Sequence, residues 1–414
     1  MSNLLKFPDG FLWGTATSAH QVEGDNLNDW TEWEKENAER LAREARIYWQ
    51  PWQQKKFLEM FSPENYISGR ATDHYNRYEE DFDLAKVMNN NAHRFSIEWS
   101  RIEPEEGKFD EKEIEHYRQV IWALKKRGIE PFVTLWHYTN PIWFQKKGGW
   151  LNKNSPKYFE RYANKISRSL QNVKFWITLN EPDDIYAFYA YYTGRYPPQE
   201  KSFRKTWRAL NNLVSAHKKA YRKIHENCPS SMVGFANNII YFESKGIIAR
   251  IIKIFANKYW NFWFLRKTFS YNDFIGCSFY RHNTLSSFKV NQNENIETTD
   301  IGWEIYPKGI YYVLKELKKY QKPIYITENG LADAQDKYRE KFIIGHLNWI
   351  HKAITEGVDV RGYFYWSLLD NFEWDKGFWP RFGLVEIDYQ TMERKVRPSA
   401  QEYAKICKNN GLIT

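Results

Sequence analysis

Two glutamates in similar sequence surroundings are the residues best placed to do chemistry. Glu181 follows the apolar run FWITL and precedes Pro182, while Glu328 follows PIYIT and precedes Asn329-Gly330. Each apolar run has the composition of a buried strand, so each glutamate is predicted at a strand's C-terminal end. Two carboxyl groups that face one cleft can cleave a glycosidic bond, one protonating the leaving oxygen and the other acting as nucleophile or base.

Eight strand-like runs alternate with helix-like segments and must position these glutamates. The strands are predicted at Phe11–Gly14, His93–Trp99, Glu130–Trp136, Lys174–Leu179, Met232–Asn237, Asp273–Phe279, Pro323–Thr327 and Arg361–Trp366. Parallel strands need helical returns, and eight returns close a ring. The sequence therefore predicts an α/β fold, a single (β/α)8 TIM barrel with extended βα loops, as one catalytic domain over residues 1–414. An open doubly wound sheet is the alternative, but no Gly-rich phosphate loop follows an early strand.

Polar or aromatic residues occupy most of the predicted strand ends. These ends are Thr15 to Gln21, Trp136-His137-Tyr138, Asn180-Glu181, Phe279-Tyr280, Glu328-Asn329-Gly330 and Trp366. Barrel enzymes place their working residues at this end of the strands, so the pattern favours a shared site.

Two helical segments have definite sequence signals. One starts at Asp110 and ends at Arg127-Gly128, with Gly128 as its C-terminal cap. The other lies in the long excursion from Glu32 to Tyr66, where Glu36 and Arg40 are spaced to form an i,i+4 pair. That excursion either walls a pocket or adds helical packing.

Composition narrows the class of partner. Aromatic residues make up 18% of the chain, including 19 Trp, and flat rings suit sugar faces, nucleobases or interfaces. The net charge is +9, but 51 acidic residues are interleaved with 60 basic ones, which argues against a nucleic-acid partner. The three cysteines indicate neither a disulfide framework nor a zinc site. Without a signal-like start or a long apolar run, a soluble cytoplasmic protein with no membrane span is expected.

The stretch GIIARIIKIFANKYWNFWFLRK, residues 246–267, combines aromatic and basic residues with no acidic one. It fits either a helix on a membrane surface or a buried barrel helix whose Arg and Lys reach water. We expect the buried helix.

Five stretches together resemble glycoside hydrolase family 1, the β-glucosidase and β-glycosidase family. They are FPDGFLWGTATSAHQVEG (7–24), RFSIEWSRIEP (94–104), TLNEP (178–182), YITENG (325–330) and YFYWSLLDNFEWDKGFWPRFGLVEIDY (363–389). The resemblance extends from Phe7 to about Lys408. It implies a retaining, exo-acting β-glycosidase on a (β/α)8 barrel, without cofactor or metal. Its partners would be small-molecule β-glycosides or oligosaccharides with terminal glucosyl, galactosyl or fucosyl residues.

The resemblance also implies roles for individual residues. Glu181 would be the general acid/base and Glu328 the nucleophile, supported by Arg94, Tyr280 and Asn180. The implied sugar-binding residues are Gln21, His137, Tyr138, Ser278, Trp366, Glu373, Trp374 and Phe382, with Trp366 as the stacking floor.

These roles make physical demands on the site. The Arg94 cation would favour the ionised form of Glu328, whereas Glu181 must keep its proton near neutrality and needs surroundings that disfavour its charge. A covalent glycosyl-enzyme predicts carboxyl groups about 5–5.5 Å apart. Asp183 and Asp184 either raise the pKa of Glu181 through their charge or are solvated loop residues, and we expect the latter.

Several positions depart from the family pattern. Ser278 replaces a usual Asn, so a contact near the acid/base would be lost or filled by water. Tyr138 replaces a common Trp and reduces the stacking surface. Asn89-Asn90-Asn91 replaces a Gly-containing turn, which Asn tolerates. At 414 residues the chain is also short for the family, which predicts an open aglycone side with weak selectivity.

Two alternatives to a working β-glycosidase follow from the same residues. One is a sugar-binding barrel that has lost turnover. The other is a 6-phospho-β-glycosidase, which Glu373 disfavours because a carboxylate there would repel a phosphate dianion. The same carboxylate can accept hydrogen bonds from two hydroxyls, so the site would discriminate only weakly between glucose and galactose.

Overall fold

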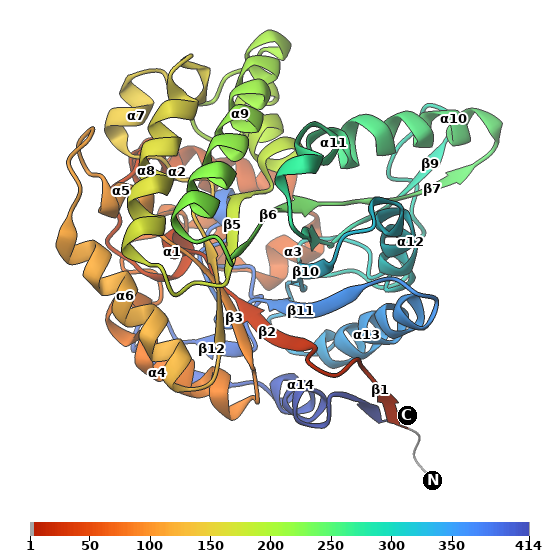
Figure 1. Cartoon of the computed structure of the whole chain (residues 1–414). Coiled ribbons are helices and arrows are strands. Elements are labelled where there is room, and N and C mark those ends of the chain that lie inside the picture. Colours follow the sequence, from red (N-terminus) through yellow and green to blue (C-terminus); the bar gives the residue numbers. More distant parts are fainter. Residues whose placement is uncertain (1–3, 414) are drawn as a thin grey trace.

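Eight parallel strands close into a barrel in the computed structural model, which describes residues 4–413 (Figure 1). In barrel order they are β2 (Leu12–Ala16), β3 (Ala92–Ser96), β4 (Glu130–Thr134), β5 (Phe175–Asn180), β6 (Met232–Asn238), β8 (Ile275–Ser278), β10 (Ile324–Asn329) and β11 (Val360–Trp366). Pairing of β11 with β2 completes the ring. The predicted barrel is therefore confirmed, although the strand expected to end at Trp99 ends at Ser96, because Trp99 starts a short helix.

Helices return the chain between strands and cover the outside of the barrel (Figure 1). The longer ones are α2 (Asp29–Tyr48), α4 (His74–Val87), α6 (Glu111–Lys126), α8 (Ser155–Ser169), α9 (Phe203–Asn227), α10 (Ile247–Ala256), α12 (Lys308–Leu317), α13 (Arg339–Thr355) and α14 (Pro398–Asn409). The shorter ones are α1 (Ala19–Val22), α3 (Pro51–Lys56), α5 (Trp99–Ile102), α7 (Ile142–Lys146) and α11 (Trp263–Thr268). None of the helices within residues 4–413 is long and apolar enough to cross a membrane.

The sequence signals at helix ends correspond to real caps. The Asp110 side chain accepts hydrogen bonds from the N–H groups of Lys112 and Glu113, at 2.8 and 3.3 Å, at the start of α6. Past its end, Gly128 adopts a φ of +70°, which glycine allows at little cost. In the substituted turn before β3, Asn89 takes a φ of +57°, so the expected tolerance of Asn for this conformation is confirmed.

The excursion after β2 contains α2 and α3, and it reaches the barrel mouth. Arg40 of α2 pairs with Glu44 rather than with Glu36, so the predicted i,i+4 pair is wrong in its partner. The chain leaving α2 brings Trp49 to the wall of the cavity at the barrel mouth. This part of the excursion therefore walls a pocket.

Three small sheets lie outside the barrel. Antiparallel β1 (Leu4–Lys6) and β14 (Gly411–Ile413) bring both chain ends together (Figure 1). Antiparallel β12 (Val385–Ile387) pairs with β13 (Arg394–Val396). Parallel β7 (Tyr241–Lys245) and β9 (His282–Ser286) extend from the ends of β6 and β8.

Aromatic rings fill the barrel interior below the mouth. Phe132 of β4 stacks on Phe175 of β5 with ring centroids 4.1 Å apart, and Phe364 and Tyr325 pack around them at 4.6 and 5.3 Å from Phe132. Such filling makes the barrel a packed core rather than a pore. It leaves the strand ends above it as the rigid floor of a site.

The basic aromatic stretch from 246 to 267 does not form one helix. Residues 261–265 in its second half, including Phe262, Phe264 and Leu265, are buried. In its first half, α10, Ala249 is the buried residue. The expectation of a buried barrel helix is therefore wrong for α10, whose apolar side chains are described below.

Candidate active site

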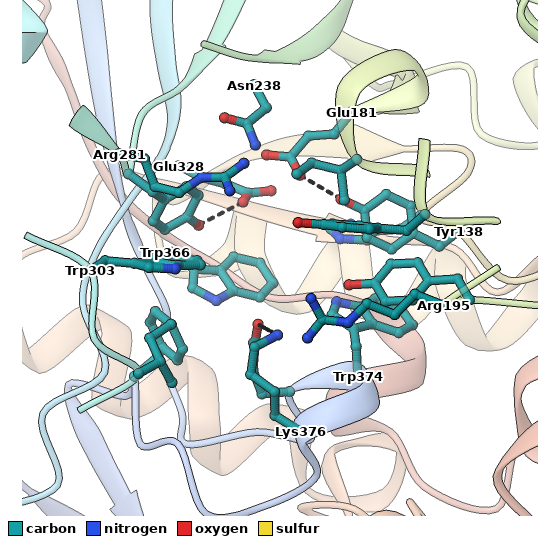
Figure 2. A pocket seen from close by; sticks show the side chains of 18 of the residues that line it. Tyr138, Glu181, Arg195, Asn238, Arg281, Trp303, Glu328, Trp366, Trp374 and Lys376 are labelled. Carbon is teal, nitrogen blue, oxygen red and sulfur yellow. Dashed lines mark hydrogen bonds and ion pairs between the residues drawn. The ribbon is translucent and has the colours of Figure 1, made fainter. Parts of the chain in front are cut away.

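A cavity of about 260 Å³ opens at the C-terminal ends of the barrel strands. Nine residues predicted from the sequence line it, namely His137, Tyr138, Glu181, Tyr280, Glu328, Trp366, Glu373, Trp374 and Phe382. Figure 2 shows Glu181 and Glu328 facing each other across the upper part of the cavity, with Trp366 and Trp374 below. The strand ends thus bring together residues that lie far apart in sequence.

Glu328 is held by two hydrogen-bond donors. Arg94 Nη1 lies 2.5 Å from Glu328 Oε1, and Tyr280 Oη donates to Glu328 Oε2 at 2.7 Å. The register of β10 shifts next to this glutamate, an irregularity that aims a side chain away from the regular ladder. Glu328 is therefore fixed in the cavity as a hydrogen-bond acceptor.

Arg94 connects Glu328 to a second part of the site. Its Nη2 donates to Asn180 Oδ1 at 2.5 Å, and its Nε donates to Thr134 Oγ1 at 3.1 Å. The Asn180 amide in turn donates to His137 Nε2 at 3.0 Å. Burial and the nearby Arg94 charge hold the pKa of His137 well below its usual range, so this ring is neutral and accepts the bond.

Glu181 occupies a different environment. It has a φ of +41°, a left-handed conformation that is strained for glutamate, and Pro182 then starts a π-helix over Pro182–Tyr192. Burial, followed by the charge of Glu328, raises the pKa of Glu181 above its usual range. Tyr138 opposes this shift, because its hydroxyl donates to Glu181 Oε2 at 2.5 Å.

The two aspartates after Glu181 are not solvated, contrary to our expectation. Asp183 and Asp184 are 8% and 4% exposed. Burial raises the pKa of Asp183 to about 7, and it raises that of Asp184 well above its usual range. The pKa of Glu181 is raised by its own burial and by the charge of Glu328 rather than by these aspartates.

The lower part of the cavity combines flat rings with one carboxyl group. His137 stacks on Trp366 and on Trp374, with ring centroids 5.9 Å away in each case. Burial raises the pKa of Glu373 to about 7, while the nearby Lys376 opposes the rise. Gln21 is fully buried and points its amide at Phe372 O, 2.8 Å away, with Glu373 Oε2 at 3.5 Å. Gln21 therefore holds the segment that carries Glu373 through these contacts.

Close packing explains the glycine that follows the second glutamate motif. A Cβ atom at Gly330 would lie 1.8 Å from the carbonyl oxygen of Trp366. Any side chain there would push the two strand ends apart. Gly330 thus keeps the Glu328 segment beside the tryptophan that lines the cavity.

Ser278, a predicted sugar-binding residue, lies outside the lining of the cavity. Its hydroxyl lies 3.2 Å from Thr327 Oγ1 and is fully buried, and it is not among the residues that line the cavity within the described chain. Its neighbour in the strand register, Asn238 on β6, reaches the cavity beside Glu181 instead (Figure 2). An amide is thus supplied from the adjacent strand, which a motif comparison at position 278 does not reveal.

Other cavity residues also escaped the sequence reasoning. Arg281 follows Tyr280 and lies beside Glu328, and its charge lowers the pKa of Glu181 (Figure 2). Trp303 and Tyr189 come from connecting segments without a recognisable motif. The position of Arg281 one residue after a predicted strand end was the available signal.

A second cavity of about 850 Å³ adjoins the first and shares Trp49, Tyr189 and Arg195 with it. Its outer wall includes Arg40 and Glu44 of α2. A molecule whose end occupies the first cavity would therefore find a wide space for its remaining part.

Comparison with known proteins agrees with this geometry. The model of glycosyl hydrolase family 1 matches residues 4–269 and 243–412. The chain belongs to this family. It is accordingly a glycoside hydrolase, and the (β/α)8 barrel is the architecture of its solved relatives.

Relatives match the chain over nearly its whole length. Beta-glucosidase A of Thermotoga maritima is 33% identical, with 99% of each chain covered. A 6-phospho-beta-galactosidase of Staphylococcus epidermidis is 28% identical over 98% of each chain. Among solved structures, a beta-glycosidase from Pyrococcus horikoshii matches with a TM-score of 0.88 and 39% identity, covering 100% of this chain and 97% of that one. The T. maritima beta-glucosidase in complex with glucoimidazole matches at 0.85 and 32%, covering 99% of this chain and 100% of that one.

Proposed function

We propose that this family member is a retaining, exo-acting β-glycosidase that removes terminal, unphosphorylated glucosyl, galactosyl or fucosyl residues. The observation that carries the proposal is the contrast between two facing carboxyl groups. Glu328 accepts hydrogen bonds from Arg94 and Tyr280, while burial favours the protonated form of Glu181. One carboxylate and one carboxylic acid are what a double displacement requires.

In the proposed mechanism, Glu328 attacks the anomeric carbon as Glu181 gives its proton to the leaving glycosidic oxygen. The resulting glycosyl-enzyme ester is attacked by water, whose proton returns to Glu181, and the sugar leaves with its configuration retained. The Asn180 amide, oriented by Arg94, hydrogen-bonds the 2-hydroxyl most strongly in the transition state. We further propose that residues 1–414 act as one catalytic domain, with Glu181 and Glu328 about 5–5.5 Å apart.

The sugar side and the aglycone side are supported by different features. Trp366 and the Glu373 carboxyl suit a sugar ring and its hydroxyls, and the nearly buried surroundings suit a single terminal residue. The wide second cavity supports weak selectivity for the aglycone. The cations nearest Glu373 argue against a phosphate site, because Asp375 already pairs with both Lys376 and Arg195.

The test uses nitrophenyl β-glucoside, β-galactoside, β-fucoside and 6-phospho-β-galactoside with wild type and Glu328→Ala. We expect turnover of the first three by wild type only, and azide should restore the variant by forming a glycosyl azide of inverted configuration. Preference for the phosphorylated substrate would overturn the proposed specificity. Binding without turnover would instead favour a sugar-binding barrel, and rescue with retained configuration would overturn the nucleophile assignment.

A further inference from the structure

The exposed side of α10 is strongly apolar. Ile247, Ile251, Ile254, Phe255 and Tyr259 follow one another at helical spacing and are 52–77% exposed. Large apolar side chains rarely form a stripe along one side of a helix unless another surface covers that stripe. The opposite side packs on β7 and β9 through Ala249, Ile252 and Leu285.

The unit of β7, β9 and α10, which we call the α10 platform, projects from the rim of the barrel (Figure 1). β7 starts soon after the end of β6 and β9 soon after the end of β8, so the platform is attached at the same end of the barrel as the cavity. The turn after β9 lies opposite Lys245 and adds exposed Phe288 and Val290, at 83% and 62%. The apolar surface is thus not limited to one helix.

Cations predominate on α10 and α11, while the acids Glu243 and Glu316 lie near Lys253. Arg250, Lys253 and Lys258 lie on or next to α10, and Arg266 and Lys267 follow on α11. None of these five cations forms an ion pair within residues 4–413, whereas Arg118 and Lys126 of α6 pair with Glu115 and Glu79. No acidic residue occurs between 246 and 267.

We propose that the α10 platform docks the enzyme on an anionic lipid bilayer surface. An apolar helix face with unpaired basic residues beside it is the pattern of helices that lie in the membrane interface without spanning it. A second copy of the chain fits less well, because a two-fold contact through α10 would bring these cations against their own equivalents. The lipid phosphates would pair with these cations.

Vesicle sedimentation with the purified full chain tests this proposal. We expect binding to vesicles of phosphatidylcholine with phosphatidylglycerol, little binding to pure phosphatidylcholine, and weakening by high salt. Arg250→Gln/Lys258→Gln should weaken binding roughly thirtyfold at low salt. Ile251→Glu/Phe255→Glu should abolish it. The control Ile47→Glu/Val87→Glu makes the same kind of change at two exposed apolar residues, 77% and 71% exposed, on other elements and should bind like wild type.

Hydrolysis of a nitrophenyl glycoside verifies the fold of every variant, because none of these residues lines the cavity. No vesicle binding by wild type, or equal loss in the control, overturns the proposal. A dimer seen by light scattering, which Ile251→Glu/Phe255→Glu dissociates without any lipid binding, would assign the surface to a second copy instead.

Discussion

The two glutamates share one cavity but not one environment. Glu328, at the end of β10, accepts from a buried arginine and a tyrosine. Glu181, at the end of β5, receives one tyrosine hydroxyl, and its burial and the charge of Glu328 outweigh the favourable charges of Arg94 and Arg281. The comparison teaches that the role open to each carboxyl group is set by the groups that surround it at its strand end, since the two residue types are identical.

The largest expected effect on activity, and the strongest test of the different roles of the two glutamates, comes from removing the proposed acid. Glu181→Ala should slow glycosides with poor leaving groups by about 10²–10⁴-fold, because these need protonation of the departing oxygen. Nitrophenyl glycosides with good leaving groups should lose much less in the first step. Rates for a series of aryl glycosides of graded leaving-group pKa measure this, and a uniform loss across the series would refute the assignment.

A matched pair of tyrosine variants sharpens the comparison. Tyr280→Phe removes a donor from the proposed nucleophile and should lower kcat/KM by about ten- to a hundredfold, the worth of a hydrogen bond to a charged group. Tyr138→Phe removes a similar bond from the proposed acid and should lower it less. Equal losses in both variants would mean that the two carboxyl groups play the same part.

The pH profile of Tyr138→Phe is a third, smaller test. Glu181 must be protonated to act as acid, so activity falls as the pH rises through its pKa. The Tyr138 hydroxyl stabilises the ionised form, so its removal should raise this pKa and move the basic limb of the kcat/KM profile upward by about one unit. Tyr280→Phe serves as the control, and a downward move of the limb in Tyr138→Phe would contradict the cause that we assign.

The smallest expected effect concerns the buried aspartates. The pKa of Asp183 rises from 3.8 to about 7 on folding, so the folded protein holds this proton more tightly. Stability from this group is complete below the unfolded pKa and is lost as the pH rises through the folded one. Asp183→Asn should therefore gain about 3 kcal/mol in unfolding free energy at pH 8 relative to pH 5. Urea unfolding measures it against exposed Glu386→Gln, and an unchanged pH dependence would show that Asp183 is ionised in the fold.

The barrel could be predicted from sequence because its strands are apolar runs that end in polar residues. Its two glutamates follow such runs directly, so position alone brought them to one face. For Ser278 and Asn238, the sequence could not predict which side chain reaches the cavity. Their register across β8 and β6 decides which side chain reaches the cavity, and register depends on pairing between strands rather than on either strand alone.

The hydrogen bond from Tyr138 to Glu181 and the exposed side of α10 were not predicted, for related reasons. The sequence indicated a smaller ring at position 138, whereas its positive φ of 76° turns the hydroxyl toward Glu181. A stretch of apolar and basic residues such as 246–267 has the same sequence pattern whether its apolar side chains pack inward or face solvent. Only the placement of α10 on a two-stranded support, outside the barrel wall, separates its exposed half from its buried half.

Because the hydrogen bonds of Arg94 join three strands, turnover can be used to detect when the barrel has closed. One guanidinium reaches Thr134 on β4, Asn180 on β5 and Glu328 on β10, which join different parts of the ring. A slip of one residue in any of these strands would carry an acceptor out of its reach. During refolding, activity should consequently return only when the ring closes, later than the helical signal in circular dichroism.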